Sequence, residues 1–188
     1  WKKAVPLARS LESFAMLNLL KTEFEKMVLF SSLHTSYDEL FSIFGEKIIS
    51  YETYAEMITL RDIYTETLLL KRKAHYDIDE TLREKIYSLL EKIDRCTPPS
   101  SNQSFWYSHY YRMSRAVLLY LLGQIRNSLE LLREVLADWK KNNRFLGSHG
   151  EYYIEVLYMI NYAGILQGDY DHVRSVFNDP LNTLLDEP

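Results

Sequence analysis

A short turn-and-helix signature recurs four times along this chain of 188 residues. Each copy begins a predicted helix with a bulky residue, and these openers are Tyr37, Ile78, Ile125 and Tyr170. They lie 41, 47 and 45 residues apart, and self-similarity at a period of this size marks helical pairs that stack on one another. The signature therefore predicts an all-α fold, a solenoid of about four antiparallel helix pairs.

Apolar residues recur at steps of three and four between these turns, which is the period of a helix with one buried face. The pattern places four helical pairs at approximately 5–49, 50–95, 105–143 and 150–179. Residues 96–104 contain two prolines and a polar string, and we read them as a loop inside a single domain covering 1–188. Gly123 and Gly168 follow first helices, where a left-handed residue suits a C-cap.

Helix starts are predicted from capping-box spacing, in which a cap residue precedes a glutamate by three positions. Ser36 with Glu39 would start the partner helix of the first pair. Asp77 with Glu80 would start the partner helix of the second pair.

Composition restricts the function classes. The formal net charge is −4 with both signs interleaved, which disfavours nucleic-acid binding because that requires a basic face. The longest apolar run, 116–122, is much shorter than the roughly 20 residues of a membrane-spanning helix, so no membrane span is expected. The single cysteine, Cys96, favours a reducing compartment, and we expect a cytoplasmic location. Because the sequence begins at Trp1 without methionine, we expect it to be a piece of a longer polypeptide.

The segment 167–177 resembles the tetratricopeptide repeat, whose first helix ends in Gly-x-Tyr and whose second helix carries a small residue and then an aromatic one. Gly168, Tyr170 and Phe177 match these positions, and Val173 takes the small position. In the third repeat, the same places are filled by Gly123, Ile125, Ser128 and Leu132. The resemblance covers about 85 residues, and longer first helices would explain a period above the consensus of 34. HEAT-type helical pairs are the alternative, since their period is close to the observed one.

The resemblance implies a right-handed solenoid of about four antiparallel helix pairs. It also implies a concave groove, lined by first helices, that takes an extended peptide or a partner helix. Carried onto this sequence, the groove-facing positions are Tyr110, Met113, Val117 and Tyr120 in the third repeat, and Glu155, Tyr158, Tyr162 and Ile165 in the fourth. Tyrosine combines a large contact area with a polar tip, which makes it common among binding anchors. The alternative is that these rings fill the core and the seams between repeats.

Arg112 lies beside these aromatic residues and would bind a carboxylate on a ligand. The alternative is that Arg112 and Arg115 pair with acidic residues of the adjacent helix, where an exposed pair adds little stability.

Signatures of catalysis and of metal binding are weak. The five histidines are scattered, and none has the His-x-x-x-His spacing that places two ligands on one helix face. The stretch from His75 to Glu80 is rich in acids, but it lacks the glycine and the later glutamate of a calcium loop. We therefore predict no catalytic, cofactor-binding or metal-binding residues, and a chain that is not an enzyme.

The leading hypothesis is a non-catalytic scaffold that binds a protein segment on its concave face, with Arg112 or Glu155 providing charge selectivity at the rim. The second hypothesis is a sensory or regulatory segment of a larger signalling or transcription-regulating protein, in which a ligand shifts the packing between repeats. A helical-repeat enzyme is the third, and it would need a spatial cluster of His, Asp and Glu. Exposed tyrosines would also permit a homodimer.

Overall fold

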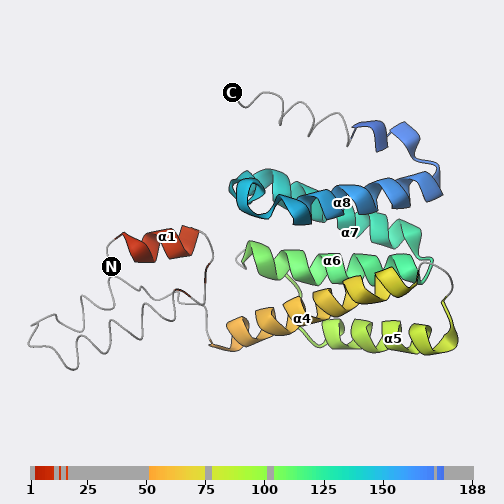
Figure 1. Cartoon of the computed structure of the whole chain (residues 1–188), viewed down its shortest axis with the longest axis horizontal. Helices are drawn as coiled ribbons and strands as arrows, with labels where there is room; N and C mark the ends of the chain where they lie inside the picture. Colours follow the sequence, from red (N-terminus) through yellow and green to blue (C-terminus); the bar gives the residue numbers. More distant parts are fainter. Residues whose placement is uncertain are drawn as a thin grey trace, which may run out of the picture. The chain divides into compact units, whose positions relative to one another are not determined.

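The computed structural model describes residues 3–10, 13, 16, 51–74, 78–100, 104–171 and 173–175. The chain divides into two compact units, Trp1–Ile58 and Thr59–Pro188. Within the described residues all regular secondary structure is helical, which confirms the all-α class (Figure 1). None of the helices described there combines the length and the apolar character needed to cross a membrane. A single domain over 1–188 stays a prediction.

The first unit contains α1, Ala4–Ser10, and the first turns of α4, Tyr51–Lys73. Val5 and Ala8 of α1 are buried. Most of the predicted first pair, 5–49, and its cap at Ser36 lie outside the described residues.

The second unit contains the remainder of α4 and the elements that follow it. These are α5 (Glu80–Asp94), α6 (Phe105–Leu121), α7 (Ile125–Lys141), the 3-10 helix η1 (Asn143–Phe145) and α8 (Leu146–Gln167). α6 packs against α5, α7 and α8, and α7 packs against α8. Successive helices from α5 to α8 run in opposite directions (Figure 1). α6 and α7 lie within the range predicted for the third pair, 105–143.

Burial differs between neighbouring helices. In α7 the buried side chains recur every three or four residues, and the opposite face is charged. In α6 buried residues occur all round the helix, because three other helices pack against it. Among the described residues, the largest fully buried side chains are Trp139, Tyr107, Phe145, Leu60, Ile86, Leu89, Ile93, Met113, Leu118, Leu132, Met159 and Ile160.

The start of α5 corrects one expected cap. The side chain of Asp79 accepts a hydrogen bond from the backbone N–H of Leu82 at 2.7 Å, while the expected cap residue, Asp77, lies outside the described residues. The helix begins at Glu80, so this glutamate occupies the first helical position and cannot serve as the third residue of a capping box. Asp79 satisfies one of the free N–H groups of the first turn.

Two glycines end α6 and α8 with the same hydrogen-bond geometry, as the sequence predicts. Gly123 and Gly168 have φ of 75° and 74°, in the left-handed region. After α8, the N–H of Gly168 donates to Ile165 and that of Asp169 donates to Gly164, at 3.1 and 2.9 Å. The matching bonds after α6 are Gly123 to Tyr120 and Gln124 to Leu119. Both ends are Schellman motifs, which satisfy carbonyls that a helix end leaves unpaired.

We expect Gly168→Ala to lower the free energy of unfolding by about 1 kcal/mol, because a Cβ is disfavoured in the left-handed region. No atom lies within 4 Å of a Cβ built at Gly168, so the effect comes from the backbone alone. Gly147→Ala in the first turn of α8 is the matched control, since its site is equally open and its φ is not left-handed. Urea unfolding followed by far-UV circular dichroism should show a neutral or stabilising control. Equal losses for the two variants would refute the backbone explanation.

Candidate functional site

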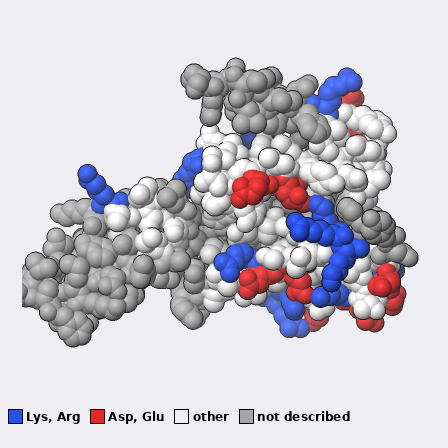
Figure 2. Space-filling model, viewed as in Figure 1, with Lys and Arg blue, Asp and Glu red and all other residues white. Residues whose placement is uncertain are grey.

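Exposed apolar side chains follow one face of α8. We call this set the α8 stripe; it consists of Ile154, Tyr158, Tyr162, Ile165 and Leu166. Their steps of three and four place them on one side of the helix, and each residue is between 43% and 66% exposed. The sequence from Val156 to Gln167 contains no charged residue. Figure 2 shows acidic side chains over the earlier turns of α8, an uncharged area over its later turns, and basic side chains gathered beside it over the end of α4. Apolar faces of this kind mark interaction surfaces.

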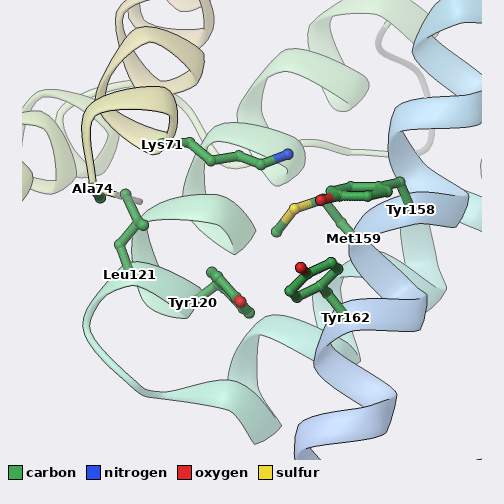
Figure 3. A pocket seen from close by; sticks show the side chains of 7 residues that line it. All are labelled: Lys71, Ala74, Tyr120, Leu121, Tyr158, Met159 and Tyr162. Atoms are coloured by element: carbon green, nitrogen blue, oxygen red, sulfur yellow. The ribbon is translucent and has the colours of Figure 1, made fainter. Parts of the chain in front are cut away.

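A pocket of about 270 Å³ opens beside the α8 stripe. Its lining comes from the end of α4, from the end of α6 and from α8: Lys71, Ala74, Tyr120, Leu121, Tyr158, Met159 and Tyr162. Figure 3 shows Tyr158 and Tyr162 on one wall, Tyr120 facing them and Lys71 reaching over the pocket. The structure thus brings together three predicted site residues, Tyr120, Tyr158 and Tyr162.

Lys71 supplies the positive charge at this pocket. Its ammonium group forms an ion pair with Glu155 and lies 4.8 Å from the centre of the Tyr158 ring, within cation–π range. The Lys71 side chain is 15% exposed and that of Glu155 is 28% exposed. No local sequence pattern predicts this ion pair, since Lys71 and Glu155 lie 84 residues apart along the chain.

The two stripe tyrosines act together at the pocket wall. The rings of Tyr158 and Tyr162 lie 5.1 Å apart between centres at an angle of 42°. Desolvation, followed by the hydrogen bond to Tyr162, raises the pKa of Tyr158 above its ordinary value. Desolvation, followed by the nearby Tyr162, also raises the pKa of Tyr120. The phenols of Tyr158 and Tyr120 are therefore neutral at physiological pH and offer hydrogen-bonding groups beside an apolar surface.

Three of the groove-facing positions expected in the third repeat are buried. Tyr110 is 8% exposed, and Met113 and Val117 are fully buried. The expected register is wrong for these residues, because α5, α7 and α8 all pack against α6 and put these positions in the core. Tyr110 instead follows the alternative given for the tyrosines, in which the ring fills the core.

Arg112 is held by the neighbouring helix. Its guanidinium lies 2.9 Å from Glu134 and 2.6 Å from Asp138, both on α7, and it also contacts the hydroxyl of Ser108. Arg115 pairs with Asp94 of α5. The alternative weighed from the sequence, pairing with acids of an adjacent helix, is the arrangement seen here.

A buried aromatic cluster surrounds His109 on α6. Its rings belong to Tyr64, Phe105, Trp106, Tyr110, Trp139 and Tyr152, all within 6.0 Å of His109 between ring centres. Trp139 Nε1–H donates to His109 Nδ1 at 3.3 Å. Burial lowers the pKa of His109 to about 3 and raises those of Tyr64 and Tyr110. This cluster is a core, and the scattered histidines of the sequence gave no signal for it.

Among the described residues, no group of three or more His, Cys, Asp or Glu side chains is arranged to hold a metal ion. His75 and Asp77, from the acid-rich stretch of the sequence, lie outside these residues.

Comparison of the chain with protein-family models, with curated proteins and with solved structures found no match.

Proposed function

We propose that this chain is a non-catalytic binding module whose second unit receives a segment of a partner protein on the α8 stripe and in the pocket beside it. The observation that carries the proposal is the continuous apolar surface of half-exposed side chains along α8, which ends in a pocket between helices. Burying such a surface on a partner releases water from apolar atoms, which is the main favourable term in association. Tyr158 and Tyr162 add rigid contact area with polar tips.

The shape of the surface favours an elongated occupant. The α8 stripe extends from Ile154 to Leu166, which is about 18 Å at 1.5 Å per helical residue. An amphipathic helix that docks on an apolar surface presents anchors at the same spacing of three and four residues. A partner helix or an extended peptide is therefore the best-fitting occupant.

We also propose that the second unit is a helical-repeat solenoid, either tetratricopeptide-like with longer first helices or HEAT-like. Two features support this assignment. The left-handed glycines Gly123 and Gly168, each closing a Schellman motif, recur after 45 residues, which is a period found in helical-repeat arrays. Successive antiparallel helices also pack on their neighbours in chain order, as stacked repeats do.

The proposal is tested by capturing partners with the wild-type chain and with a Tyr158→Ala, Tyr162→Ala variant. We expect partner binding to weaken roughly 30-fold in this variant, because each ring is a central anchor of the surface. Crosslinking from a lysate of the source cells, followed by mass spectrometry and titration of the purified partner, provides the measurement. Tyr87→Ala on α5 is the matched control, since that tyrosine is 55% exposed and lies outside the stripe. A partner bound equally by all three proteins would place the binding site elsewhere.

A sensory or regulatory segment is the second candidate function. It is favoured by the pocket, which is lined by α4, α6 and α8, so that a bound ligand would touch three helices at once. A ligand that changes the resistance of the folded chain to proteolysis, with no protein partner captured, would move this candidate ahead.

A further inference from the structure

Resting on the proposed function, we infer that the partner segment carries a carboxylate that binds Lys71 in place of Glu155. Glu155 is then an internal stand-in for the acidic group of the partner. The occupant of the α8 stripe is, in chemical terms, an acidic amphipathic peptide or helix.

The position of Lys71 is the first reason. The side chain is mostly buried, and it lies over the Tyr158 ring at the edge of the pocket, directly beside the apolar contact surface. A partner that covers Tyr158 also covers Lys71 and removes the remaining water from its ammonium group. A buried cation has to be paired, so the covering segment must either leave Glu155 in place or provide its own carboxylate.

The charge of the surroundings is the second reason. From Val156 to Gln167, α8 offers no acid, while Arg72 and Lys73 are exposed beside Lys71. Among the described residues, neither Arg72 nor Lys73 has an ion-pair partner. Glu155 pairs with Lys71, so among the described residues the basic last turn of α4 keeps unpaired positive charge that attracts an acidic partner.

The position of Glu155 makes it replaceable. Its side chain is more exposed than that of Lys71, 28% against 15%, so Glu155 can turn back to water when another carboxylate arrives. Glu151, one turn earlier on α8, is exposed and repels anionic surfaces from that end of the helix. A segment with its acid at one position therefore fits better than a uniformly anionic bilayer.

The probe for the test is a phage-displayed library of random peptides, selected on the whole chain and depleted of clones that bind the Tyr158→Ala, Tyr162→Ala variant. We expect the enriched peptides to combine aromatic or aliphatic residues with Asp or Glu. The tightest peptide, labelled with a fluorophore, is then titrated into Lys71→Gln and Glu155→Gln by fluorescence anisotropy. We expect Lys71→Gln to weaken binding about tenfold, because a charge-assisted hydrogen bond is lost, and Glu155→Gln to strengthen it several-fold, because a competitor is removed.

The opposite signs are the decisive readout, since a purely structural ion pair would make both variants weaker binders. Lys140→Gln and Lys141→Gln, in the last turn of α7, are controls for a general loss of positive charge and should leave the affinity unchanged. The inference would be overturned, and the proposed function left standing, by tyrosine-dependent peptides whose affinity is unchanged by Lys71→Gln. Tyrosine-dependent peptides whose affinity falls in both variants would have the same consequence. If no peptide depends on the tyrosines, both fail. Two other results, each in the absence of peptide binding, would identify a different occupant. Tyrosine-dependent binding to phosphatidylserine vesicles would identify a membrane, and tyrosine-dependent dimers in analytical ultracentrifugation would identify a second copy of the chain.

Discussion

Replacing Trp139 by alanine is expected to lower the free energy of unfolding by about 3–5 kcal/mol, the usual range for removing a buried aromatic side chain. Trp139 is fully buried on α7, and its indole meets Phe105 edge-on at 4.9 Å between ring centres. It also contacts Tyr153 at the start of α8, so one side chain joins α6, α7 and α8. A loss of this size is a large part of the 5–15 kcal/mol that stabilises a typical domain.

The hydrogen bond of Trp139 can be tested separately from the packing of its ring. Trp139→Phe keeps much of the ring volume but leaves Nδ1 of His109 without its donor. We expect this variant to lose less than Trp139→Ala and still about 1–3 kcal/mol, the cost of an unpaired buried polar group together with the smaller ring. Urea unfolding should be followed by far-UV circular dichroism, because removing a tryptophan also removes a fluorescence signal. Tyr87→Ala, at an exposed site of α5, should stay within about 0.5 kcal/mol of wild type. A Trp139→Ala protein as stable as this control would show that the cluster repacks without a cavity.

The helices of the second unit were predictable because their signals are local. Steps of three and four residues identified α6 and α7, and Gly123 and Gly168 marked helix ends that the structure confirms. Each of these signals depends only on neighbouring residues, through side-chain spacing or through one backbone dihedral. The cap of α5 was misplaced because Asp77 and Asp79 both precede Glu80, and only the actual first turn decides between them.

The site was predictable only in part because it depends on packing between distant segments. The sequence placed Tyr158 and Tyr162 on an open face, and both are exposed. The same helical register assigned Met113 to an open face, yet Met113 is buried because α6 has neighbours on several sides. Periodicity identifies which residues share a face, but it does not tell how many faces are covered. The role of Lys71 was not predictable because no local pattern connects it to Glu155.

Acidification is expected to destabilise the chain through His109 before the carboxylates respond. Burial lowers the pKa of this histidine to about 3 in the folded chain, against an ordinary value of 6.5. Below pH 6.5 the imidazole therefore binds a proton in the unfolded chain but stays neutral in the folded chain. The free energy of unfolding consequently falls as the pH falls. The loss approaches 1.4 kcal/mol per pH unit, which amounts to about 2 kcal/mol between pH 7.5 and pH 5. It would level off only near pH 3, where the folded chain also binds the proton.

His109→Gln isolates this contribution, because glutamine keeps an acceptor for Trp139 and never gains a charge. The variant is expected to be less stable than wild type at pH 7.5, where the imidazole packs better among the rings, and to lose less stability on going to pH 5. His149→Gln is the matched control, since the side chain of His149 is 43% exposed and can reach water in the folded chain. Urea unfolding at both pH values gives the stability of each variant relative to wild type at each pH. Wild type and His109→Gln share every other titrating group, so the contributions of those groups cancel in their comparison. Parallel pH curves for wild type and His109→Gln would mean that the folded chain opens to protonate His109, and the cluster around it would then be a mobile part of the core.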